Sequence, residues 1–233
     1  MGAAVDTMSA TLKVLQFGDS MFPVGAFAFS NGLEMAVQNG VVRDRSTLEE
    51  FVRTVTRLAA TGDGVALLCG YRGAAAGDLD QIRRADEAVL LRKLNEEMRT
   101  MTVRMGRKLA EAASRVVGDS VLGQRFRVAA GDDVPVTYPV ALGALFAALG
   151  LSEQDAFTTH QYGAAVMVLS AALRLMRVDH FDTQTILFAV NEKALDDYRE
   201  VAAATLDDMH TFAPVADVLA AAHLHAHVRM FMN

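Results

Sequence analysis

The chain has 233 residues with a formal net charge of −6 and a pI of about 5.5. Hydrophobic residues make up 52% and charged residues 21% of the sequence, which is typical of a globular protein with one sizeable core and excludes a disordered chain. The acidic balance argues against non-specific binding to nucleic acid, which needs clustered Lys and Arg.

The single cysteine, Cys69, lies in an apolar stretch, so no intrachain disulfide forms and a buried structural thiol is expected. The first residues lack the pattern of a secretory signal, and no apolar run approaches the 18 residues that a membrane span needs. We therefore expect a cytoplasmic protein that binds neither membranes nor nucleic acid.

Long segments rich in Ala, Leu, Met, Glu and Arg predict an all-α fold, a single-domain bundle of about eight to ten helices over residues 1–233. About residues 1–9 are expected to be flexible. In chain order, helices are predicted at 10–20, 32–39, 48–58, 65–75, 78–91, 95–117, 139–150, 152–176, 182–208 and 214–226.

Turn and cap signals separate these helices. Ser30 or Asn31 is a candidate cap for the second helix, and the run Ser46 to Glu49 has the form of a capping box for the third. The pair Gly62 and Gly64 is expected to interrupt the next stretch. Residues 131–139 form the clearest predicted loop, because they combine Gly, Asp and Pro before an almost wholly apolar helix.

No catalytic constellation stands out: the sequence has neither a Gly-rich phosphate loop nor a GxSxG nucleophile elbow. Of the six histidines, His160 and His180 have no partner nearby in the sequence and are interpreted as structural. Two alternatives stay open. The cluster His223, His225 and His227 would suit a direct nickel or zinc carrier, because His223 and His227 lie one helical turn apart. Scattered residues such as Tyr162, Arg174 and His180 would have to build the site of a small helical enzyme.

The stretch from residue 21 to 34, MFPVGAFAFSNGLE, resembles the signature of the UreF family of urease accessory proteins. The matching positions are Pro23, Val24, Gly25, Ala26, Phe27, Ser30, Gly32, Leu33 and Glu34. Near the end of the chain, His223 and Arg229 keep a spacing found in the family, and Arg229-Met230-Phe231 resembles its terminal Arg-Leu-Phe. Weaker similarities lie between them, at Gly106, Tyr138, Pro139, Val140, Gly143, Tyr162 and Arg174.

The chain also departs from the family pattern. Leu224 stands where Glu is usual, Thr137 occupies a place often taken by His, and His180 falls in a segment that usually reads Pro-Leu-Gly-Gln. We interpret these positions as belonging to a partner-facing side of the protein.

The resemblance implies an all-helical, usually dimeric protein that is not an enzyme and holds no stably bound cofactor. Its implied partners are a UreD/UreH-like accessory protein, a UreG-like GTPase and apo-urease. With them, the protein would support GTP-dependent nickel insertion into urease and gate the GTPase.

The resemblance also implies the residues that bind these partners. Pro23 and Gly25 would shape the first motif, and a C-terminal segment of about residues 223–233 would become ordered on the UreD-like partner. The full set of predicted partner-binding residues is Pro23, Gly25, Phe27, Ser30, Gly32, Glu34, Tyr162, Arg174, His223, Arg229 and Phe231.

Overall fold

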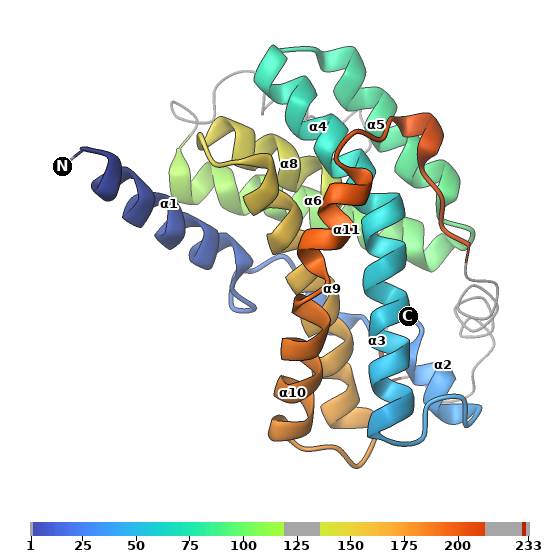
Figure 1. The fold of residues 1–233 in the computed structure, drawn as a ribbon. Coiled ribbons are helices and arrows are strands. Elements are labelled where there is room, and N and C mark those ends of the chain that lie inside the picture. The colour runs from blue at the N-terminus through green and yellow to red at the C-terminus, as the bar shows by residue number, and fades with distance from the viewer. Residues whose placement is uncertain (1, 119–135, 213–229, 232–233) are drawn as a thin grey trace.

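The structure, a computed structural model, describes residues 2–118, 136–212 and 230–231 (Figure 1). Within these ranges every regular element is a helix, so the all-α prediction is confirmed. The α-helices are α1 (Gly2–Gly18), α2 (Leu33–Gln38), α3 (Arg45–Ala59), α4 (Val65–Ala76), α5 (Leu79–Arg92), α6 (Glu96–Val117), α8 (Tyr138–Ala148), α9 (Glu153–Leu175), α10 (His180–Asn191) and α11 (Ala194–Val201). Three short segments accompany them: the 3-10 turns η1 (Ala26–Ala28) and η3 (Leu206–Asp208), and the π-helical η2 (Ala60–Gly64).

Several helices start where the sequence predicts, at residues 78, 95 and 152. The side chains of Asp78 and Asn95 accept hydrogen bonds from the first turns of α5 and α6, and Ser152 forms a capping box with Asp155 at α9. These side chains satisfy amide groups that would otherwise lack a partner at the helix N-terminus.

Other predicted boundaries were wrong. The first helix begins at Gly2 and not at residue 10. The capping box of α3 is formed by Asp44 and Thr47, not by Ser46 and Glu49. The Thr47 amide donates to Asp44 Oδ1 at 2.9 Å and the Asp44 amide donates to Thr47 Oγ1 at 3.1 Å, while Glu49 pairs with Arg53. Of the predicted loop at 131–139, residues 131–135 lie outside the described residues, and Tyr138 and Pro139 already belong to α8. The predicted helix at 214–226 also lies outside the described residues.

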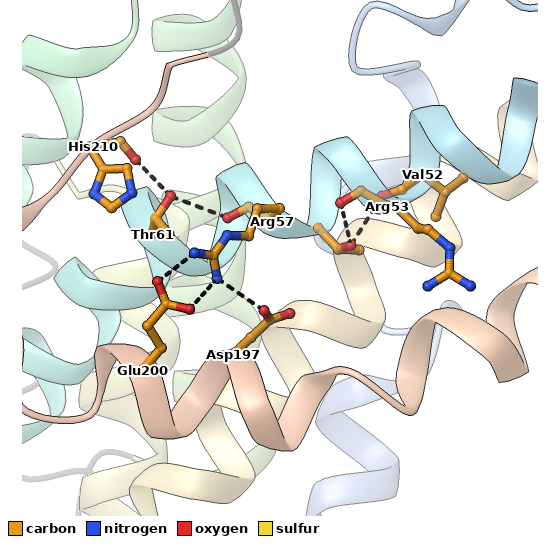
Figure 2. A network of polar contacts seen from close by, with 8 residues as sticks. Val52, Arg53, Arg57, Thr61, Asp197, Glu200 and His210 are labelled. Carbon is orange, nitrogen blue, oxygen red and sulfur yellow. Dashed lines mark hydrogen bonds and ion pairs between the residues drawn. The ribbon is translucent and has the colours of Figure 1, made fainter.

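Two further corrections concern continuity. The glycines of η2 do not interrupt the chain, since α3, η2 and α4 form one uninterrupted helical run from Arg45 to Ala76. The predicted helix at 182–208 is instead divided into α10, α11 and η3. Arg57 of α3 holds α11 in place through Asp197, at 3.2 Å, and through a paired contact with Glu200 (Figure 2).

The same network reaches the segment that follows η3. Thr61 Oγ1 donates to the carbonyl of His210 at 2.7 Å (Figure 2). The amide of His210 in turn donates to the carbonyl of Thr61 at 3.1 Å. The junction of α3 and η2 is therefore the point where three distant parts of the sequence meet.

Two large apolar clusters form most of the core of the described residues. One joins α4, α5, α6 and α8 around residues such as Leu67, Leu142 and Phe146, in the upper part of Figure 1. The other joins α2, α3, α9 and α10 around Leu33 and Leu48. Helix α9 contributes to both, through Phe157 at its beginning and Val168 further on. It therefore ties the two halves into one body.

The first cluster packs with helix backbones in direct contact. A Cβ atom on Gly143 of α8 would lie 2.3 Å from the carbonyl oxygen of Leu67 on α4, and one on Gly106 of α6 would lie 2.3 Å from the carbonyl oxygen of Val136. No side chain fits at either crossing. Cys69 of α4 is buried here as expected, and burial raises the pKa of its thiol.

None of the helices in the described ranges is long and apolar enough to cross a membrane.

Candidate partner-binding site

The first motif folds as a turn between α1 and α2 that divides its two phenylalanines. Gly25 and Gly32 have φ angles of 80° and 84°, which glycine adopts without the steric cost of a side chain. Phe29 is buried against Met101 and Met105 of α6, whereas the side chain of Phe27 is 62% exposed. The buried ring thus fixes the turn, and the exposed ring is presented to solvent.

Glu34, in the first turn of α2, is buried with 2% of its surface exposed. Its Oε1 accepts a hydrogen bond from the amide of Met230 at 2.7 Å, and its Oε2 accepts one from the amide of Phe231 at 3.1 Å. Behind it, the hydroxyl of Ser30 accepts a long bond of 3.4 Å from the Glu34 amide. A carboxylate near the start of α2 therefore holds residues that lie almost two hundred positions later in the sequence.

Arg174, at the end of α9, completes the site. Its guanidinium lies over the ring of Phe231 at 4.0 Å and over the ring of Phe27 at 4.7 Å, and its Nη2 donates to the carbonyl of Phe27 at 3.0 Å. Cation–π contacts of this kind orient the guanidinium and the two rings together. We call Phe27, Glu34, Arg174 and Phe231 the Arg174 cluster.

The structure therefore brings together five of the residues that sequence reasoning chose, namely Phe27, Ser30, Glu34, Arg174 and Phe231. Gly25 and Gly32 shape the turn beside them, and Pro23 is exposed at its beginning. Tyr162 is 39% exposed but lies twelve residues before Arg174 on α9, about 18 Å along the helix axis. His223 and Arg229 lie outside the described residues.

Two alternative functions were left open by the sequence, a small helical enzyme and a direct metal carrier. Tyr162 and His180 are exposed at separate points of α9 and α10, and the spacing along α9 keeps Tyr162 away from Arg174, so these three residues do not assemble one enzyme site. In the described ranges no group of three or more His, Cys, Asp or Glu side chains could hold a metal ion. The cluster His223, His225 and His227 lies outside those ranges.

We interpreted the positions that depart from the family pattern as facing a partner, and for Thr137 this interpretation is wrong, because Thr137 is fully buried. It precedes α8, and both its amide and its hydroxyl donate to Oδ1 of Asp86 on α5, at 2.7 and 2.6 Å. Burial raises the pKa of Asp86 to about 7, although the two hydrogen bonds act in the opposite direction. The hydrogen bonds between Thr137 and Asp86 thus fix the start of α8 in the interior of the protein. His180 is exposed as interpreted, and Leu224 lies outside the described residues.

Sequence reasoning missed a cavity of about 150 Å³ between α6 and α9. Its lining includes Met98, Met101 and Met105 of α6 and His160 and Met167 of α9. Asp63 and Lys93, paired at 2.8 Å, also contribute to the wall. The spacing of the three α6 methionines along the sequence would have placed them on one face, but only the fold shows that a space remains there.

These features define a class: an all-helical protein whose candidate site combines an exposed aromatic ring, an arginine and the segment at Met230 and Phe231, which a buried carboxylate holds. Comparison with known proteins assigns the family. The UreF family model matches residues 42–191, and the chain therefore belongs to the UreF family.

Relatives extend the match to nearly the full length. The chain is 48% identical over 227 residues to urease accessory protein UreF 2 of Brucella canis, covering 97% of this chain and 93% of that protein. It is equally identical to urease accessory protein UreF 1 of Brucella melitensis, with 97% and 94% covered. Urease accessory protein UreF of Yersinia enterocolitica is 46% identical over 226 residues, with 97% and 99% covered.

Proposed function

We propose that this chain is a non-catalytic chaperone of urease maturation. The observation that carries the proposal is the identity of 46–48% to urease accessory proteins across 97% of the chain. In this role it joins a UreD/UreH-like accessory protein and a UreG-like GTPase, supports nickel insertion into apo-urease and gates GTP hydrolysis. It acts in the cytoplasm, as a homodimer, and holds no cofactor of its own.

The Arg174 cluster is the surface proposed to bind these partners. Aromatic residues and arginines are enriched among the residues that dominate protein interfaces, and Phe27 has more than half of its surface exposed. Glu34 and Ser30 are buried and make no such contact themselves. Their role is to position α2 and the segment at Met230 and Phe231, so that Arg174 lies between two rings.

The first experiment compares urease made from the cognate gene cluster with and without this gene, measuring nickel content and activity. Loss of the gene is expected to leave apo-urease, and its return to restore both metal and activity. Fully loaded urease in the absence of the gene would refute the proposed function.

A second experiment tests the site with two exposed phenylalanines. Phe27→Ala is expected to weaken capture of the UreD-like and UreG-like partners at least about tenfold, because truncating a hot-spot residue costs about 2 kcal/mol or more. Phe188→Ala is the control, since Phe188 on α10 is 72% exposed but lies outside the cluster. If both variants bind equally well, or both fail, the Arg174 cluster is not the binding surface.

A further inference from the structure

The cavity between α6 and α9 is lined mainly by apolar side chains and reaches the protein surface. Its lining includes Met98, Met101 and Met105 of α6 and Met167 of α9. Leu94, in the connection between α5 and α6, also belongs to the lining and is 69% exposed. Because a residue of the lining is itself exposed, a small molecule can enter the cavity from solvent.

The volume of the cavity suits one small apolar group. It is about 150 Å³, and an apolar protein cavity of about that volume binds a benzene ring. Methionine side chains adapt to the shape of a ligand, because they are unbranched and their sulfur is polarisable. Gly163 of α9 also lines the cavity, and a Cβ atom added there would meet nothing within 4 Å. An apolar body of about benzene size therefore fits this space.

The charged side chains of the lining leave one positive charge in excess. Among the described residues that line the cavity, these side chains are Asp63, Arg92 and Lys93. Asp63 and Lys93 are paired at 2.8 Å and are largely buried, with 19% and 12% exposed, so they compensate each other. The charge of Arg92 is not compensated in this way.

Within the described residues, Arg92 is bonded to neutral groups. Its Nε donates to the carbonyl of Met209 at 3.2 Å, its Nη1 to that of Ala88 at 3.2 Å and its Nη2 to that of Leu206 at 3.0 Å. A guanidinium has five N–H donors, so one donor on Nη1 and one on Nη2 have no partner among these residues. Carbonyl groups satisfy donors without neutralising the charge, and a partly buried cation is stabilised by an anion.

We propose that this cavity binds one small amphipathic monocarboxylate, whose apolar body lies among the methionines and whose carboxylate interacts with Arg92 and Lys93. One negative charge balances the excess positive charge of the lining. A cation would be repelled, and a dianion would leave a charge uncompensated in a mostly apolar space. None of the four residues of the Arg174 cluster lines the cavity, so this site is additional to the proposed partner-binding surface.

The first test uses the wild-type protein and three ligands of similar size: phenylacetate, its neutral amide phenylacetamide and the cation 2-phenylethylammonium. Binding is followed by NMR of protein labelled with methyl-13C methionine. We expect saturable binding of phenylacetate, binding of the amide at least about tenfold weaker because it lacks the charged contact, and no saturable binding of the cation.

The same spectra locate the ligand. The methyl signals of the four lining methionines should shift, and those of the exposed Met8 and Met21 should not. Absence of phenylacetate binding, equal affinity for the amide, or shifts confined to methionines outside the lining would overturn the proposal.

A matched pair of variants tests the charge of the lining. Leu94→Glu and Leu91→Glu each add a carboxylate at an exposed leucine, 69% and 77% exposed, but of the two only Leu94 lines the cavity. Leu94→Glu should weaken phenylacetate binding about fivefold or more, because its carboxylate compensates the excess positive charge. Leu91→Glu should change the affinity less than about twofold in physiological salt. Equal effects of the two variants would show that the ligand is not in this cavity.

A carboxylate beside an apolar group can come from a free acid or from the C-terminus of a polypeptide, and the proposal is the free acid. The peptide acetyl-glycyl-glycyl-phenylalanine presents a benzyl group beside its terminal carboxylate. It should bind more weakly than phenylacetate, because its backbone exceeds the space available. Tighter binding of the peptide would overturn the assignment to a free acid. None of these results depends on whether the protein supports urease maturation.

Discussion

Two helix pairs of this protein pack in opposite ways. Helices α4 and α8 touch backbone to backbone at Gly143 and Leu67, with no room for even one added carbon. Helices α6 and α9 face each other through methionines and leave a cavity beside Gly163, where an added Cβ would meet nothing within 4 Å. A helix-interior glycine is thus indispensable in one pair and replaceable in the other, and only the neighbouring atoms decide which.

The largest expected effect comes from replacing the glycine in each of these two helix pairs. Gly143→Ala should destabilise the protein by about 3 kcal/mol or more, because its Cβ would lie 2.3 Å from a backbone oxygen that cannot move alone. Gly163→Ala should instead stabilise it by about 0.5–1 kcal/mol, since alanine is the better helix former. Urea unfolding of both variants measures the difference, and similar free energies of unfolding would contradict the packing described for these pairs.

An intermediate effect is the pH dependence of the free energy of unfolding, to which one buried titratable group beside each helix pair contributes. Asp86 holds the start of α8, and its pKa is raised to about 7 from 3.8. The folded state therefore keeps a proton that the unfolded state loses, and this contribution to stability is present below pH 3.8 and is lost as the pH rises through about 7. In total it amounts to roughly 4 kcal/mol.

His160 beside the cavity acts in the opposite direction. Its pKa is lowered to about 4 from 6.5, so its contribution, roughly 3 kcal/mol, is present above pH 6.5 and is lost as the pH falls through about 4. The two groups oppose each other between about pH 4 and 6.5. In Asp86→Asn, stability should rise with pH over that range; in His160→Phe, it should fall. Unfolding midpoints measured from pH 4 to 7 check this, and curves parallel to the wild type would refute both assignments.

The smallest expected effect concerns Arg174, the exposed arginine of the Arg174 cluster. Arg174→Lys loses the flat contact with Phe27 and Phe231, and because Arg174 is exposed the cost in stability should stay within about 1 kcal/mol. Hydrogen exchange at the Phe231 amide should nevertheless become faster. Arg177→Lys, at an exposed arginine nearby, is the control and should leave that amide unchanged.

Sequence was a good guide where local chemistry decides the structure. Asp78, Asn95 and Ser152 mark helix starts because their side chains cap amides only two or three residues away. It failed at α3, where Asp44 and Thr47 outcompete the similar Ser46 and Glu49. Two chemically equivalent caps one or two residues apart cannot be ranked without the tertiary contacts of the helix.

For the candidate site, too, some features could be predicted from the sequence and others could not. Phe27, Glu34 and Arg174 were identified through the family resemblance, whereas the hydrogen bonds of Glu34 to Met230 and Phe231 join positions 34 and 231 and leave no local pattern. The burial of Thr137 was also missed, because its partner Asp86 lies 51 residues away. Contacts between distant parts of the chain emerge only when the helices have been assembled.

The π-helical segment η2 sets the rotational phase of the long run from Arg45 to Ala76. A π segment carries one residue more than the α-helical turn it replaces, and one residue corresponds to about 100° of rotation about the axis. The extra residue of η2, which begins 15 residues after the start of α3, therefore rotates α4 about the helix axis relative to α3. This rotation determines which face of α4 packs against α8. Gly62 and Gly64 allow the backbone of η2 to pack directly against the side chains of Thr211 and Phe157. The close packing of α4 on α8 therefore depends on a local irregularity in the helical run that precedes α4.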